Sequence, residues 1–192
     1  MRSTTTEAAS SEWRTAEPHL EKRGLMPTPT PDDKSSAAVA ALRAAAERGD
    51  ADALAELFAP DVVFHSPMTM RLSFEGREEV VALHRDIFAV LEDLRTSEPL
   101  VRGDEWSFSF TATVRGVPLE AHNLLRFNSQ AQIVENTIFV RPLPALATLF
   151  ATLPPRVSTR RRGRLHGTVA GLLAQPLAVA LRAADRLVPK FL

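Results

Sequence analysis

The feature that most constrains this fold is a change of hydrophobic period near the middle of the chain. In "GREEVVALHRDIFAVLEDL", apolar residues recur three and four positions apart, which predicts a helix with one buried face. In "EWSFSFTATV", which follows, the period is two, and Ser and Thr alternate with larger apolar residues. Such alternation predicts a strand with one apolar face. That face consists of Trp106, Phe108, Phe110, Ala112 and Val114.

The other segments supply short helices and further strands. The sequence predicts helices at "SSAAVAALRAAAERGD", "DADALAELF" and, after Pro142, "LPALATLFATL", and strands at "VVFHS", "VPLEAHNLLRF" and "IVENTIFVRP". This order is typical of an α+β fold, in which helices cover one face of a curved antiparallel sheet. A sheet wrapped around the long helix forms a cone with an apolar interior. We therefore expect a pocket.

Composition divides the chain into three parts. Residues 1–35 are rich in Ser, Thr, Pro and charge, which predicts a disordered leader, and Met26 is a candidate alternative start. Residues 36–152 form the expected domain, and residues 153–192 a tail. From Arg156 onward the chain has eight Lys or Arg and one acid, a net charge of +7, whereas the rest has 15 basic and 22 acidic residues, a net of −7. Such asymmetry suggests a separate role for the tail.

Two readings of the tail remain open. Its apolar residues favour one side of a helix that Pro176 would kink, and only 17 uncharged residues separate Arg164 from Arg182, few for a membrane span. The helix can pack on the domain or on its partner. Alternatively, residues 160–190 form a basic amphipathic helix on an anionic membrane surface. We expect no nucleic-acid partner, because the arginines lack interleaved aromatic residues and the domain is acidic.

Several classes of chemistry are excluded or disfavoured. The chain has no Cys and no Tyr, so thiol nucleophiles, thiolate metal sites and phenolic acids are unavailable. The histidines share no ligand spacing and no glycine-rich phosphate loop is present, so we expect no metal and no cofactor. The N-terminus lacks the apolar region of a secretory signal, and the absence of Cys suits a reducing compartment. We expect a cytoplasmic protein.

Three phrases, "RGDADALAELFAPDVVFHSP", "GREEVV" and "LLRFNSQAQIVENTIFVRP", resemble the nuclear-transport-factor-2-like superfamily, especially its SnoaL-like polyketide cyclase branch. The resemblance covers roughly residues 37–152. It implies a cystatin-like α+β barrel with a cone-shaped sheet, and a homodimer formed through the outer side of the sheet. It says little about activity, because this fold hosts isomerases, cyclases, dehydratases and non-enzymatic binders.

The resemblance also selects candidate reacting groups. Ketosteroid isomerases of this superfamily have an Asp base before the strand-ending Pro and a protonated Asp before an "FRF" phrase, and the matching residues here are Ser66 and Asn123. A serine cannot act as a base at neutral pH. His84, inside the apolar stripe of the long helix, is a candidate acid or base or else an inert core histidine. Asn123 is a candidate donor to a ligand carbonyl or else a satisfied amide in the sheet.

The expected pocket is mostly apolar, and two classes of function are compatible with it. The first is a small-molecule protein that holds a polyketide- or terpenoid-like compound, with cyclase, isomerase or dehydratase chemistry at His84 and Asn123. The second is a non-catalytic carrier, sensor or protein-interaction module. In both, His65 points away from the pocket. The residues expected to bind the ligand are Phe64, Ser66, Phe108, Phe110, Leu125, Asn136 and Ile138.

Overall fold

The structure is a computed structural model that describes residues 33–71 and 73–187. Most of the leader expected at residues 1–35, including Met26, lies outside the described residues. The elements in chain order are α1 (Asp33–Arg48), η1 (Asp52–Leu54), β1 (Phe58–His65), β2 (Ser73–Glu75), α2 (Arg77–Phe88), β3 (Glu92–Thr96), β4 (Leu100–Arg102), β5 (Glu105–Val114), β6 (Val117–Phe127), β7 (Ile133–Arg141), α3 (Leu143–Arg162) and α4 (Arg164–Leu187).

A seven-stranded sheet has the order β2-β1-β7-β6-β5-β3, and β4 pairs with β5. Strands β5, β6 and β7 form an antiparallel meander, and the tight β5–β6 turn places Arg115 and Gly116 at φ of 48° and 73°. Positive φ at both central residues matches the twist of the flanking strands. The sheet is mixed rather than purely antiparallel, because β1 runs parallel to β7, with Phe64 opposite Asn136. It curves without closing into a barrel.

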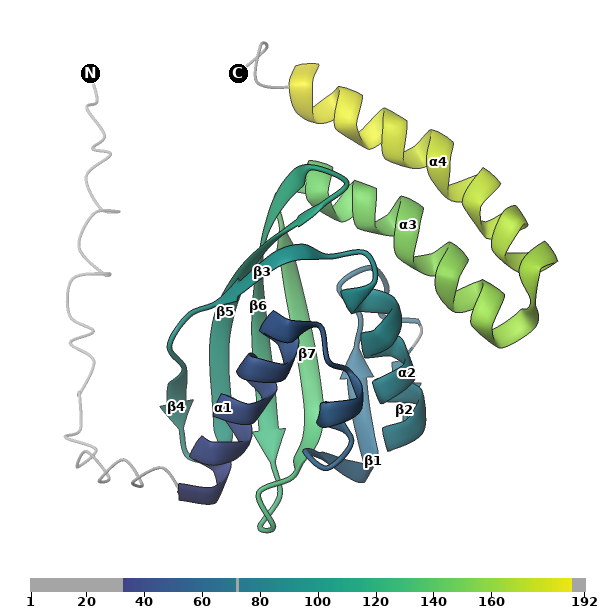
Figure 1. The fold of residues 1–192 in the computed structure, drawn as a ribbon. Coiled ribbons are helices and arrows are strands. Elements are labelled where there is room, and N and C mark those ends of the chain that lie inside the picture. Colours follow the sequence, from purple (N-terminus) through teal and green to yellow (C-terminus); the bar gives the residue numbers. More distant parts are fainter. Residues whose placement is uncertain (1–32, 72, 188–192) are drawn as a thin grey trace, which may run out of the picture.

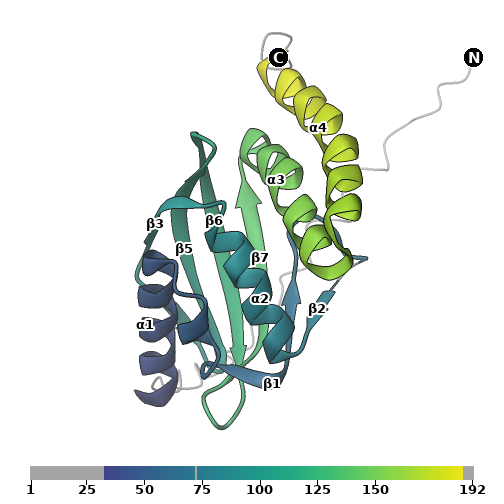
Figure 2. The same cartoon turned by 45° about the vertical axis from the view of Figure 1, so that its right-hand side comes forward.

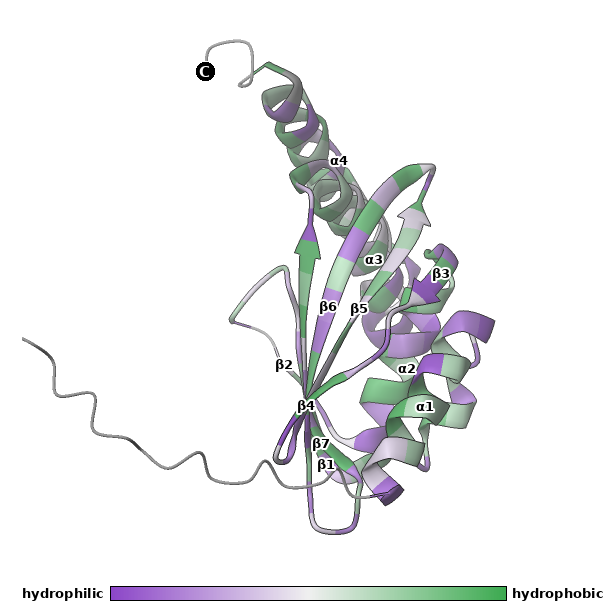
Figure 3. Ribbon diagram, turned by 90° about the vertical axis from the view of Figure 1, so that its left-hand side faces the viewer, coloured by the Kyte–Doolittle hydropathy of each residue, from purple (hydrophilic) through white to green (hydrophobic). Residues whose placement is uncertain are grey.

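The helices α1 and α2 lie on the same side of the sheet, which Figure 3 shows edge-on. The alternation in β5 has the predicted effect, since every second residue from Trp106 to Val114 is buried. Val80 and Leu83 of the α2 stripe belong to the same buried core as Trp106 and Phe108 of β5, and His84 of the stripe is also buried. Sheet, α1 and α2 together make the cone (Figure 1), and buried residues from all three form a common hydrophobic core.

A pair of antiparallel helices, α3 and α4, extends from one end of the cone and is called the helical hairpin below (Figures 1 and 2). Helix α3 is longer than predicted, because it continues through Pro154 and Pro155 to Arg162. Prolines inside a helix remove backbone hydrogen bonds and usually end it. Here Gly171 of α4 lies against Pro155, so packing within the helical hairpin compensates. The boundary expected between residues 152 and 153 therefore falls inside a continuous helix.

Candidate functional site

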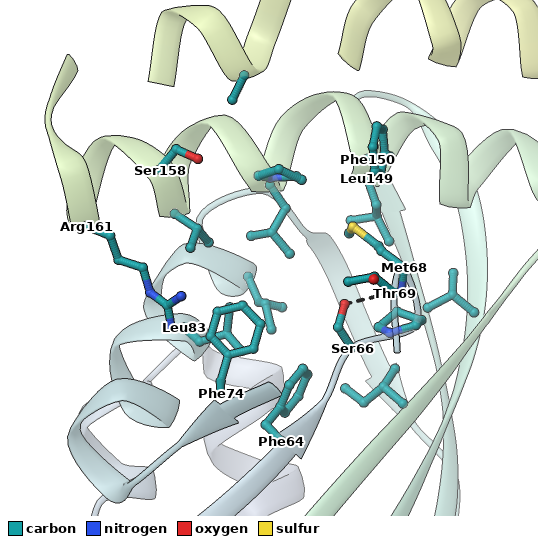
Figure 4. A pocket seen from close by; sticks show the side chains of 18 of the residues that line it. Phe64, Ser66, Met68, Thr69, Phe74, Leu83, Leu149, Phe150, Ser158 and Arg161 are labelled. Atoms are coloured by element: carbon teal, nitrogen blue, oxygen red, sulfur yellow. Dashed lines mark hydrogen bonds between the residues drawn. The ribbon is translucent and has the colours of Figure 1, made fainter. Parts of the chain in front are cut away.

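A pocket with a volume of about 650 Å³ lies between the cone and the helical hairpin (Figure 4). Its cone side is formed by the end of β1, by α2 and by the inner face of the sheet, and its other side by α3 and α4. The lining is mostly apolar, and no Asp or Glu of the described residues belongs to it. Its polar members are Ser66, Thr69, Ser158, Arg161, Arg162 and His166.

Four of the residues expected to bind a ligand line this pocket: Phe64, Ser66, Phe110 and Ile138. Ser66 follows the last residue of β1, and its Oγ accepts a hydrogen bond from the backbone N–H of Met68 at 3.2 Å. This bond closes a local turn. Ser66 is thus a turn residue with its hydroxyl at the pocket wall, and no carboxylate stands where the isomerase base would be.

A second, inner cavity of about 30 Å³ contains the other predicted polar groups. His84, Asn123 and Asn136 line it together with Phe108, but they do not line the pocket. Leu125 lines neither space and is fully buried in the core. The side chains that line both spaces form a wall between them, which sequence reasoning missed. They are Ile87, Leu91, Phe110 and Ile138.

His84 is held as a neutral imidazole. Its Nδ1–H donates to the carbonyl oxygen of Val80 at 2.7 Å, and its ring packs among Phe58, Phe64 and Phe88 at centroid distances of 5.3, 5.5 and 5.8 Å. Burial lowers the pKa of His84 from 6.5 to about 4, and the hydrogen bond to Val80 offsets this only in part. At neutral pH its Nε2 is therefore an acceptor and only a weak base.

Asn136 has a buried Oδ1 without a hydrogen-bond partner. Leaving such an atom unpaired costs about 1–3 kcal/mol. The amide lies on β7 beside β6, where Asn123 is also buried, and both face the inner cavity. A space of this size suits one hydrogen-bonding group, such as a hydroxyl or a water molecule. The inner cavity thus combines an imidazole with two amides at the bottom of an apolar cone.

An ionic cluster lies at the elbow of the helical hairpin, where α3 ends and α4 begins, and it was not predicted from the sequence. Arg160 donates to Asp86 at 2.8 Å and to Glu79 at 2.9 Å, and Arg161 lies 2.7 Å from Glu79. These contacts, led by the hydrogen bond from Arg160, lower the pKa of Glu79. The guanidinium of Arg161 also lies 4.6 Å from the ring centre of Phe74, beside the pocket (Figure 4). The acids come from α2, so the cluster fastens α3 to the cone.

Other polar groups lie away from the pocket. His65 Nε2 is 2.9 Å from Glu135 Oε1, and Arg126 is 3.0 Å from the same carboxylate, on the solvent side of the sheet. Also on that side, His122 Nδ1 lies 3.1 Å from Ser109 Oγ. Within the described part of the chain, no three His, Cys, Asp or Glu side chains are grouped so that they could bind a metal ion.

Comparison with known proteins places this geometry in a family. The model of the SnoaL-like domain family matches residues 39–136. The match begins in α1 and ends within β7, so it includes every residue that lines the inner cavity except Ile138, and none of the helical hairpin. None of the proteins with curated descriptions matches the sequence.

Solved structures share the fold. A steroid delta-isomerase from Pseudomonas aeruginosa is 26% identical, with a TM-score of 0.62, over 67% of this chain and 95% of that one. A protein with a cystatin-like fold from Silicibacter pomeroyi is 22% identical, with a TM-score of 0.62, over 77% and 96%. A SnoaL-like polyketide cyclase homologue from Jannaschia is 19% identical, with a TM-score of 0.50, over 65% and 94%.

Proposed function

We propose that this chain, which belongs to the SnoaL-like domain family, binds one apolar small molecule in the pocket between the cone and the helical hairpin. The observation that carries the proposal is the pocket itself, with a volume of about 650 Å³ and a mostly apolar lining. Sites for small molecules commonly have this size and combine an apolar wall with a few polar groups. The likeness to a steroid delta-isomerase supports a ligand of the terpenoid or polyketide class.

The geometry favours a carrier or sensor over an enzyme. Acid–base catalysis needs a group of suitable pKa within hydrogen-bond reach of the reacting atom. No carboxylate among the described residues lines the pocket, and Ser66 accepts a hydrogen bond in its own turn. His84 and Asn123 lie behind the wall that includes Phe110 and Ile138.

Thermal melting with a panel of apolar ligands tests this proposal. A ligand at 100 times its dissociation constant stabilises the folded chain by roughly 2.7 kcal/mol. Ala170 of α4 lines the pocket, whereas Ala183 on the same helix is exposed outside it. The Ala170→Phe variant should lose the ligand-induced shift, and Ala183→Phe should keep it. Equal shifts in both variants, or no shift with any ligand in the unmodified chain, would contradict the proposal.

One observation favours a second function, catalysis. The unpartnered Oδ1 of Asn136, together with His84 and Asn123, offers a polar end to the cone. If Phe110 and Ile138 move aside, a ligand can extend to this end, where Asn123 donates to its carbonyl and His84 acts as a weak base. Cyclase, isomerase or dehydratase chemistry would then use these residues.

Conversion of a β,γ-unsaturated ketosteroid to its conjugated isomer, followed by ultraviolet absorbance, tests the isomerase case. Activity that is lost in His84→Phe and kept in His122→Phe would favour catalysis over simple binding. His122 is the matched control because it lies on the solvent side of the sheet and lines neither the pocket nor the inner cavity.

A further inference from the structure

Helix α4 is oriented with its small residues toward the protein and its large apolar residues toward solvent. Gly167, Ala174 and Ala178 are buried on the side that packs along α3. By contrast, Leu165, Leu172 and Leu173 are 75%, 70% and 74% exposed. The exposed large apolar residues, called the outer face of α4 below, are Leu165, Val169, Leu172, Leu173, Leu177, Val179 and Leu187.

The contact between α3 and α4 fixes this orientation. A Cβ at Gly167 would lie 1.8 Å from Oγ1 of Thr159 and 2.8 Å from the carbonyl oxygen of Pro155, so only glycine fits at this crossing. Rotating α4 to bury its leucines would drive their side chains into the same space. Exposed apolar patches of this extent mark interaction sites. The outer face is therefore a docking surface built into the helical hairpin.

We propose that the outer face of α4 lies on an anionic membrane surface, with the helix parallel to the membrane plane. Arginines flank the outer face: Arg162 is exposed at the end of α3, Arg164 is exposed at the start of α4, and Arg182 lies further along α4. From Arg156 onward the chain carries eight basic residues against the single acid Asp185, and three of the eight, Arg156, Arg160 and Arg161, pair with acids of α2. An apolar face bordered by basic residues is the pattern of helices that bind anionic lipid headgroups.

The same charges argue against a second copy of the chain as the occupant. Two outer faces in contact would bring together the arginines of both helices, with one Asp185 in each copy to offset them. A bilayer supplies the opposite charge and needs no matching shape.

Helix α4 is long and apolar enough to cross a membrane, judged by length and composition alone. Crossing would, however, separate its glycine side from α3, and the pair of Arg160 with Asp86 holds α3 on the cone. A helix that stays on α3 lies flat on the membrane instead.

The outer face is continuous with the pocket. Leu165, Val169 and Leu173 belong to the outer face and also line the pocket. A chain docked through α4 thus holds the pocket next to the acyl region, so its ligand is a compound dissolved in the bilayer. This last step rests on the proposed function, whereas the docking itself does not.

Sedimentation of the full chain with lipid vesicles tests the docking. The chain should bind vesicles of equimolar phosphatidylcholine and phosphatidylglycerol and should bind phosphatidylcholine alone at least tenfold more weakly. Leu172→Glu places a charge on the outer face without touching the pocket and should reduce binding at least tenfold. Gln175→Glu adds the same charge at an exposed position outside the outer face and should bind within about threefold of the unmodified chain. The double substitution Arg162→Gln and Arg164→Gln should weaken binding to the anionic vesicles.

Three outcomes overturn the inference. One is the absence of vesicle binding, and another is equal binding by the Leu172→Glu and Gln175→Glu variants. The third is a lower mass for Leu172→Glu than for the unmodified chain, measured by light scattering without lipid. That result would show that the outer face is a contact between copies of the chain. Because Leu172 and Gln175 are exposed, the Leu172→Glu and Gln175→Glu variants should share the melting temperature of the unmodified chain. The Ala170→Phe variant separates the two proposals. If Ala170→Phe loses the ligand-induced shift in melting temperature but still binds vesicles, both the ligand pocket and the membrane docking are supported. If the unmodified chain binds vesicles but no ligand, only the proposed ligand pocket is contradicted.

Discussion

Arg160 donates from Nε to Oδ2 of Asp86 at 2.8 Å, although 74 residues separate them. The pair joins the elbow of the helical hairpin to α2, and Asp86 is buried. A buried carboxylate that loses its partner keeps its desolvation cost without the compensating attraction. The position of the helical hairpin over the pocket therefore depends on this contact.

The Arg160→Gln variant should lower the free energy of unfolding by about 2 kcal/mol, less than for a fully buried pair because Arg160 is partly exposed. The matched control is Arg156→Gln, since Arg156 is 3.9 Å from the same carboxylate and about half exposed. That change should cost less than about 0.5 kcal/mol. Urea unfolding measures both, and equal midpoints for the two variants would show that the pair does not fasten the helical hairpin.

Protonation of His84 should make stability depend on pH. The folded chain lowers its pKa from 6.5 to about 4, so the unfolded chain takes up the proton at higher pH. The contribution of neutral His84 is fully present above pH 6.5 and is lost progressively as the pH falls through this window toward 4. The full loss is roughly 3 kcal/mol.

Unfolding experiments between pH 6.5 and 5 isolate this effect, because ordinary carboxylates titrate mostly below that range. The His84→Phe variant should show a flatter dependence of stability on pH, whereas His166→Phe should keep the slope of the unmodified chain. A slope that His84→Phe leaves unchanged would mean that the imidazole is not buried in neutral form.

Asn136→Leu should separate stability from function. The substitution replaces an amide whose Oδ1 has no partner, so we expect the free energy of unfolding to rise by about 1 kcal/mol. If the inner cavity receives a polar group of the ligand, the same variant should bind the ligand more weakly. Asn123→Leu, on the neighbouring strand, provides the comparison. A lower melting temperature for Asn136→Leu would indicate that the amide is satisfied by a buried group.

The solvent side of the sheet should form a homodimer, as the family resemblance implies. Phe139 is exposed there, near Leu124 and His122. Phe139→Glu should convert a dimer to a monomer in light scattering at micromolar concentration. Leu172→Glu, at an exposed apolar position on α4 and away from the sheet, should leave the mass unchanged. A monomeric mass for the unmodified chain would remove the basis of this prediction.

Local patterns predicted the cone well. The alternation around Phe108 and the helical stripe containing His84 depend on neighbouring residues, so the sequence indicated both the elements and their buried faces. The parallel pairing of β1 with β7 was not predictable in this way, because Phe64 and Asn136 are far apart in the chain and the strand pattern carries no direction. Pro154 likewise indicated the end of a helix, and only packing in the helical hairpin explains why α3 continues.

The candidate site, like the fold, was predictable from the sequence only in part. The sequence indicated that Ser66, Phe110 and Ile138 face the interior of the cone, and they line the pocket. It could not indicate that Phe110 and Ile138 separate the pocket from His84 and Asn123, because this depends on how side-chain volumes fill the cone. The ion pairs of Arg160 could not be predicted from the sequence either, because a charge on the surface of a helix does not indicate which residue it will pair with.

The walls of the pocket come from two parts of the chain. The family match, residues 39–136, includes most of the cone wall and none of the wall from the helical hairpin. Grafting a different helical hairpin after β7 would change one wall of the binding site and leave the cone intact. A designer could therefore alter ligand choice with a chimera joined at Pro142, without a substitution in the sheet. A homologue with the same cone and another C-terminal extension is, for the same reason, a poor guide to what this protein binds.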